Sequence, residues 1–203
     1  MPEESSPRSI RLTDPRALRA YAHPTRLVLV GLLRRDGPMT ATQAAEATGE
    51  SVASCSFHLR QLAKYGLVEE AGGGRGREKP WQATAMFTSW DSGAIADPAA
   101  AAATEALQLA IAERYFELTT HWVQGQSQEP AEWRQAAQFG DTLLYLTAAE
   151  LEELGGRIQD VMRPYLERLD DAGKRPEGSR PVTVLQLAFP TRADGRSDQE
   201  PTP

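Results

Sequence analysis

The fold is decided by the stretch SCSFHLRQLAKYGLVEE, which runs from Ser54 to Glu70. Its apolar residues recur at i, i+4 and i+7, a spacing that puts them on one face of an α-helix. This stripe, which we expect to face the core, consists of Cys55, Leu59 and Leu62. The side chains left for an outside partner are those of Val52, Ala53, Ser56, Phe57 and Arg60.

A shorter helix precedes this one and is joined to it by a tight turn. Thr40 and Gln43 have the spacing of a capping box, which predicts a helix start followed by the small-residue run ATQAAEAT. Gly49 ends that run, and Ser51 is a good N-cap for the next helix, which we expect to extend to Tyr65. Two helices joined by about three residues that include a glycine are typical of a helix-turn-helix.

Two further helices are expected upstream of this motif. Asp14-Pro15 and His23-Pro24 each predict a helix start, because proline is favoured in the first turn. The helix over 25–35 is apolar on most sides, so it should be the central buried helix of the domain.

A β-hairpin is expected downstream. Gly66 ends the preceding helix, and the segments at 67–71 (LVEEA) and 79–85 (KPWQATA) bracket the glycine-rich GGGRGRE. This pattern predicts two strands joined by a long tip. Helices, a helix-turn-helix and a hairpin, in this order, indicate a winged helix-turn-helix.

The second half of the chain is expected to add a long helix and a small module. The run over 98–123 predicts a helix with one apolar face, which fits dimer packing better than the wall of a ligand cavity. The residues expected at this dimer interface are Leu107, Ile111, Tyr115, Leu118 and Trp122. Beyond it, 139–147 (FGDTLLYLT) and 181–190 (PVTVLQLAFP) suggest strands on either side of a helix over 148–169.

The expected fold class is therefore mainly α (α+β), with an N-terminal winged helix-turn-helix, a long dimerisation helix and a C-terminal strand-helix-strand module. The expected division of the chain is a disordered arm (1–12), a DNA-binding domain (13–86), a linker and dimerisation helix (87–126), an α+β module (127–190) and a disordered tail (191–203).

Composition narrows the function classes. The 203 residues carry a formal net charge of -6, but residues 1–84 hold 12 Lys and Arg against 9 Asp and Glu, whereas residues 85–203 hold 10 against 19. A polyanion would therefore meet a basic first half.

The longest apolar run, at 27–33, is far shorter than the ~20 residues that span a bilayer. The first residues also lack the pattern of a secretory signal, so a cytoplasmic protein is expected. The single cysteine excludes an internal disulfide and a multi-thiolate metal site.

Three segments together resemble the ArsR-type winged helix-turn-helix regulators of bacteria: DPRALRAYAHPTRLVLVGLL (14–33), SFHLRQL (56–62) and LAKYGLVEEAGGGRGREKPW (62–81). The similarity spans about residues 13–85. It implies a homodimer that binds a palindromic operator in double-stranded DNA, usually to repress transcription.

The metal sensors of the family carry paired cysteines before the recognition helix or Asp/His sets on the dimer helix. Here the first place reads ATQAAEAT and the second offers His121 near Glu113 and Glu117, so no metal and no cofactor is expected, and any small-molecule effector is unidentified.

Each candidate DNA contact has a chemical reason. Ser51 and Ser54 suit phosphate, and Ser56 can bond either class of base edge. Apolar contact with a thymine methyl group would fall to Val52, Ala53 and Phe57. Arg60 can bond guanine or phosphate, and Lys64 and Arg26 would add charge at the rim or pair with nearby acids. The cations expected on the wing are Arg75, Arg77 and Lys79.

Several residues have plainer readings. Phe57 could instead be a core aromatic, His58 fits a packing residue better than a phosphate contact, and Cys55 fits core filler better than a redox switch. The aromatic residues Trp122, Trp133 and Tyr145 could line an effector pocket but are more typical of a core. A protein-interaction module without DNA binding is the alternative function. An enzyme finds no support, since the chain has no phosphate loop and no zinc-protease spacing.

Overall fold

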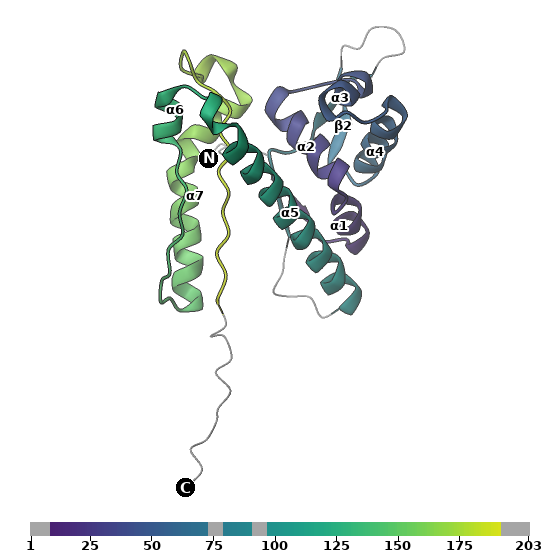
Figure 1. Cartoon of the computed structure of the whole chain (residues 1–203). Coiled ribbons are helices and arrows are strands. Elements are labelled where there is room, and N and C mark those ends of the chain that lie inside the picture. The colour runs from purple at the N-terminus through teal and green to yellow at the C-terminus, as the bar shows by residue number, and fades with distance from the viewer. Residues whose placement is uncertain (1–8, 73–78, 91–96, 192–203) are drawn as a thin grey trace, which may run out of the picture.

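The computed structural model of the chain describes residues 9–72, 79–90 and 97–191. Within these ranges the chain is mainly helical with two small sheets. Figure 1 shows one body built from the first half of the chain, a second body built from its last third, and helix α5 (Pro98–Gly125) running between them. The predicted fold class, mainly α with an N-terminal winged helix-turn-helix, is confirmed.

The first helices begin where the sequence predicts. Asp14 caps α1 (Pro15–Tyr21), because its carboxylate accepts a hydrogen bond of 2.8 Å from the backbone N–H of Arg16. Helix α2 (Pro24–Asp36) starts at the second proline and holds the fully buried Leu29 and Val30, which confirms it as the central helix of the domain.

The predicted hairpin is also present. Strand β2 (Val68–Glu70) pairs antiparallel with β3 (Trp81–Ala83), with Val68 opposite Ala83. Met39 extends this sheet by exchanging two backbone hydrogen bonds with Trp81, of 3.0 and 2.8 Å. The hairpin tip at 73–78 lies outside the described residues.

Two segments predicted to be irregular form a second sheet. Strand β1 (Ser9–Leu12) falls in the expected disordered arm, and β4 (Phe87–Trp90) falls in the expected loop. They pair in parallel, with Ile10 opposite Thr88. The prediction failed because β1 and β4 are far apart in the sequence. No local sequence pattern indicates that two such distant segments pair with each other. Arg34 of α2 holds β4 in place by donating hydrogen bonds to the carbonyl of Ala85 and the hydroxyl of Thr88. The remainder of the expected arm (1–8) and most of the expected tail (192–203) lie outside the described residues.

A single cluster of buried residues holds the first body together. It joins side chains of α1, α2, α3 (Ala41–Thr48) and α4 (Val52–Lys64) to Val68 and to the first half of α5. Ala103 and Leu107 of α5 are 1% and 0% exposed. Helix α5 is therefore part of the winged-helix core at its start and leaves it further along.

This packing changes the predicted dimer stripe of α5. Leu107 is enclosed by its own chain and is not available to a partner, because α5 leans on α1 and α2 at this point. The rest of the stripe is half-buried and stays a prediction; it comprises Ile111, Tyr115, Leu118 and Trp122. The exposed apolar side chains of α5 lie on another face, at every seventh residue: Leu109, Phe116 and Val123.

The second body contains helices α6 (Ala131–Ala136) and α7 (Ala148–Asp170) and a short 3-10 turn at 172–174. Thr147 and Glu150 form a capping box at the start of α7, so the predicted helix is confirmed. The two predicted strands are wrong: the described residues at 139–147 and 181–190 form no strand. An extended segment becomes a strand only when a neighbour bonds its backbone, and neither segment has such a neighbour within the described chain.

Candidate nucleic-acid interface

The turn of the helix-turn-helix is fixed by three side-chain and backbone devices. At the start of α3, the N–H of Thr40 donates to Gln43 Oε1 at 2.8 Å and the N–H of Gln43 donates to Thr40 Oγ1 at 3.2 Å, which confirms the capping box. Gly49 ends α3 in the left-handed region, with φ of 76°. Ser51 then caps α4, because its hydroxyl accepts the N–H of Ser54 at 3.1 Å.

Helix α4 has two clearly different faces. The predicted inner stripe is confirmed, since Cys55, Leu59 and Leu62 are all 0% exposed. On the opposite side Val52 is 47% exposed and Phe57 is 51% exposed, so Phe57 is not a core aromatic. The other exposed positions on this face are Ala53, Arg60 and Lys64, with Ser51 at the cap. Ser54 and Ser56 are half-buried at its edges. We call Val52, Ala53, Phe57, Arg60 and Lys64 the outer face of α4.

A pair of stacked imidazoles, of which His58 is buried and His23 is half-buried, supports α4 from behind. His58 is 9% exposed, and its ring centroid lies 4.5 Å from that of His23 at the start of α2. Phe57 touches the same ring edge-on, at 5.2 Å between centroids. His58 is thus a packing residue, as predicted, rather than a phosphate contact. Its ring contacts stabilise the helix that carries the outer face.

The pKa values of both histidines are lowered from their ordinary value. Burial is the main cause in each case, because it penalises the charged imidazolium. The guanidinium of Arg26 lowers both pKa values further, whereas the carboxylate of Glu50 acts in the opposite direction. The pair is therefore held in its neutral form near neutral pH.

The wing is described only at its base. Arg75 and Arg77, predicted as phosphate contacts, lie in the segment outside the described residues. Lys79 is described, and its ammonium group forms an ion pair of 2.7 Å with Glu70 across the hairpin. Both side chains are largely exposed, and an exposed ion pair contributes about 0–1 kcal/mol. A phosphate could therefore compete with Glu70 for Lys79 at little cost.

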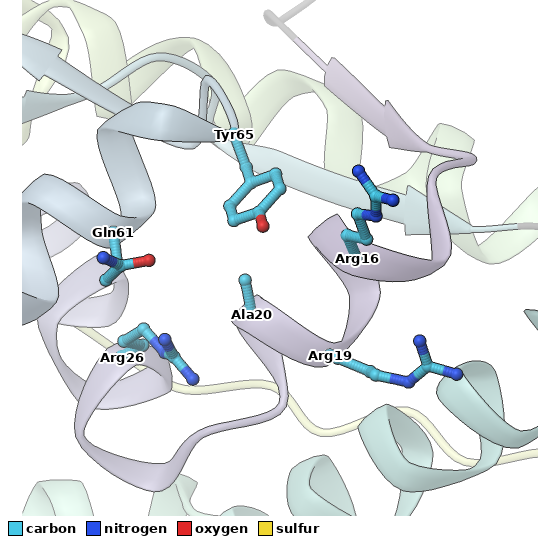
Figure 2. Close-up of a pocket in the computed structure, with 6 residues that line it drawn as sticks. All are labelled: Arg16, Arg19, Ala20, Arg26, Gln61 and Tyr65. Carbon is cyan, nitrogen blue, oxygen red and sulfur yellow. The ribbon is translucent and has the colours of Figure 1, made fainter.

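A second group of cations lies beside α4, which the sequence did not single out as a group. Figure 2 shows Arg16 and Arg19 of α1 and Arg26 of α2 around an open depression that Gln61 and Tyr65 border from the α4 side. The depression has a volume of about 330 Å³. We call these five residues, with Ala20 at the floor, the arginine depression.

The cations of this depression are weakly engaged. Arg19 donates a hydrogen bond of 3.0 Å to the backbone carbonyl of Ala99, and no acidic side chain among the described residues pairs with it. The Nε of Arg26 is buried and has no hydrogen-bond partner among the described residues, and burial lowers the pKa of this guanidinium. Arg26 was expected at the rim of the interface. Arg16 and Arg19 were missed; the only signal was their i, i+3 spacing on α1, which acquires meaning once α1 packs against α4.

The described ranges contain neither a metal site nor a membrane-spanning helix. No three His, Cys, Asp or Glu side chains within them could hold a metal ion. No helix in the described part of the chain is long and apolar enough to cross a membrane.

Comparison with known families identifies the helix-turn-helix domain. Residues 21–71 match the model of a helix-turn-helix domain, which is found in ArsR-type and other regulators. The matched segment runs from the end of α1 through α4 to just beyond β2. A search of the curated proteins found no match to this chain. The chain thus carries a helix-turn-helix domain of the kind that DNA-binding regulators use.

Proposed function

We propose that this protein is a dimeric transcriptional regulator of ArsR type that binds a palindromic operator and represses transcription. One observation carries the proposal: α4 buries Cys55, Leu59 and Leu62 completely while its opposite face stays open to solvent. An α-helix of this kind fits the major groove of B-DNA, where each base pair presents a distinct pattern of donors, acceptors and methyl groups.

Base reading falls to the outer face of α4. The guanidinium of Arg60 can donate two hydrogen bonds to one guanine. Val52, Ala53 and Phe57 supply apolar contact for thymine methyl groups, and the half-buried Ser56 bonds a base edge at the margin. Ser51 accepts a capping bond but keeps its hydroxyl proton for a phosphate, beside Ser54.

Phosphate binding extends beyond α4. The wing cations Arg75, Arg77 and Lys79 are expected to contribute to it. The arginine depression would add to it, since Arg16 and Arg26 line it together with Gln61 of α4. Guanidinium groups bind phosphate oxygens through parallel hydrogen bonds, so this depression suits the DNA backbone.

Two copies are needed to read a palindrome. Two recognition helices related by a two-fold axis would enter successive major grooves about 34 Å apart. The resemblance to ArsR-type regulators favours repression. The family's cysteine metal site has no counterpart at Ala41–Thr48, so any effector would be of another kind.

The test is selection of bound fragments from the host genome by the purified full chain, followed by footprinting. We expect an inverted repeat to be protected, with affinity falling steeply as salt rises because phosphate binding releases counterions. Failure to retard any fragment at low salt would instead favour a protein-interaction module.

Variants separate base reading from phosphate binding. Arg60→Ala should weaken operator binding by about 10- to 100-fold and relax the preference at one base pair. Arg26→Ala should weaken operator and random DNA alike and lower the salt slope by about 1. Arg157→Ala, the same charge change on α7, is the matched control and should alter neither, since Arg157 is exposed and its described partner is Glu153.

A further inference from the structure

The C-terminal body has no interior of its own. Between residues 126 and 191, no residue whose side chain the structure describes is buried. The first body, by contrast, encloses a continuous cluster of buried side chains. A segment of this length with two helices and no buried side chain lacks the apolar burial that must offset its loss of chain entropy. Its ordered shape therefore requires a covering partner.

The same body exposes a large apolar surface. Its four strongly exposed rings are Phe139, Tyr145, Tyr165 and Phe189, at 78%, 96%, 60% and 68%. With about 200 Å² for each whole ring side chain, these four rings together expose roughly 600 Å². Ten aliphatic side chains on this body add to that area: Leu143, Leu144, Leu146, Ile158, Val161, Leu169, Val182, Val184, Leu185 and Leu187. The sum exceeds the roughly 800 Å² per partner that a stable interface uses.

The backbone of this body is equally unsatisfied. Among the described residues, no N–H or C=O at 138–146 or 180–191 makes a backbone hydrogen bond. In Figure 1 the first of these extended segments descends to the start of α7 and the second descends from the end of α7, so they run in the same direction. The second is anchored along the helix, where the amide of Gln186 lies 3.9 Å from Met162 Sδ, and at its start, where Arg180 pairs with Glu129 at 2.7 Å.

We propose that these two extended segments and the apolar face of α7 are covered by the same body of a second copy, with backbone pairing between the copies. The choice of a second copy rests on the proposed function, in which two winged helices act together on one operator. Identical segments run antiparallel when the two-fold axis that relates them is perpendicular to them, which is the geometry of an antiparallel ladder. Pairing would satisfy the open backbone groups and stack the alternating apolar side chains of Leu185, Leu187 and Phe189, which share one face of the extended segment, into a shared core.

This surface is separate from the exposed stripe of α5. That stripe offers three large side chains, Leu109, Phe116 and Val123, and its backbone is already satisfied within a helix. The C-terminal body offers more apolar area and open backbone groups as well. It therefore forms the principal dimer contact in this proposal, and the half-buried stripe of α5 that begins at Ile111 stays a separate prediction.

The experiment uses the full chain without DNA, so its result does not depend on whether an operator exists. Sedimentation equilibrium should give twice the chain mass of 22.2 kDa at micromolar concentration. The double variant Leu187→Asp, Phe189→Asp should weaken the dimer at least about 100-fold, because it places unpaired charges in the shared core. The matched control Leu109→Asp, Phe116→Asp adds the same charges to the exposed stripe of α5 and should leave the dimer within about tenfold of the wild type.

Hydrogen exchange supplies an independent measurement that also checks folding. Amides at 138–146 and 180–191 should be protected in the wild type, lose protection on dilution, and exchange freely in the Leu187→Asp, Phe189→Asp variant. Amides of α2 should stay protected in every variant, which shows that the winged helix is folded. A wild-type monomer, a variant that still dimerises, or a dimer whose extended segments exchange freely would each overturn the proposal. Loss of DNA binding by a chain that still shows the protected dimer would overturn the proposed function alone.

Discussion

His23 and His58 stack against each other where α2 begins beneath α4, with ring centroids 4.5 Å apart and planes inclined by 41°. Their Nδ1 atoms are buried and have no hydrogen-bond partner among the described residues. A second positive charge at this distance from the first, with Arg26 also close, would be strongly unfavourable. The position of the recognition helix is therefore tied to the neutrality of this pair.

This pairing predicts that the winged helix loses stability on acidification. The pKa of each histidine in the folded state lies below the ordinary value of 6.5, mainly through burial and then through nearby positive charge. Unfolded chains therefore take up protons first, so stability is complete above about pH 6.5 and falls as the pH drops from there to the lowered folded-state values. Urea unfolding followed between pH 7.5 and pH 5 measures this.

Two histidine variants separate the pair from other titrating groups. His58→Gln should flatten the acid side of the stability profile, whatever it does to the stability at pH 7.5. His121→Gln, which removes an exposed histidine of α5, should leave the profile parallel to that of the wild type. An unchanged slope in His58→Gln would show that the imidazole pair does not set it.

Neighbouring positions on α4 should separate stability from DNA binding. Leu59→Ala removes a fully buried side chain and should cost about 2–5 kcal/mol in the free energy of unfolding. Phe57→Ala removes a half-exposed ring and should cost much less, yet it should weaken operator binding. Chemical denaturation and a DNA titration on both proteins give the comparison. Equal loss of stability in the two variants would contradict the assignment of faces.

The helix-turn-helix could be predicted because each of its boundaries is set locally. Thr40, Gln43 and Ser51 bond to backbone groups within three residues, and the stripe of Cys55, Leu59 and Leu62 reflects the period of a single helix. Such signals can be read from the sequence because they do not depend on how the rest of the chain folds. The predicted turn, caps and inner face consequently agree with the structure.

Features that depend on distant segments could not be predicted in this way. Strand β1 exists because β4 returns beside it, and the arginine depression exists because α1 packs near α4. The alternating pattern at 181–190 indicated an extended chain but could not reveal that no hydrogen-bonding neighbour lies beside it among the described residues. Likewise, the apolar side chains of α5 did not show which of them, Leu107 or Leu109, would meet the chain's own core.

The same substitution at two glycines should have opposite effects. Gly49 ends α3 with φ of 76°, a conformation that side-chain-bearing residues rarely adopt, so Gly49→Ala should destabilise the domain by about 1–2 kcal/mol. Gly31 lies in the middle of α2 at an exposed position, and a Cβ there would meet nothing within 4 Å. Gly31→Ala should therefore stabilise the domain by about 0.5–1 kcal/mol. Thermal unfolding of both variants measures the difference, and a shift of the same sign in both would refute it.

Cys55 should be chemically silent in the folded protein. Its side chain is 0% exposed on the inner stripe of α4, and its sulfur lies 3.6 Å from the hydroxyl of Thr48, which itself donates to the carbonyl of Ala44. A disulfide-exchange reagent can reach this thiol only when the domain opens, so its reaction should be at least about 1,000-fold slower than that of an exposed thiol. The matched comparison is Ala53→Cys in a Cys55→Ala background, which moves the thiol two positions to the outer face of the same helix.

If native Cys55 reacted as fast as that exposed thiol, it would be a candidate sensor. If it is silent, as the packing predicts, mild peroxide should leave operator binding unchanged in the wild type because no thiolate is accessible to oxidise.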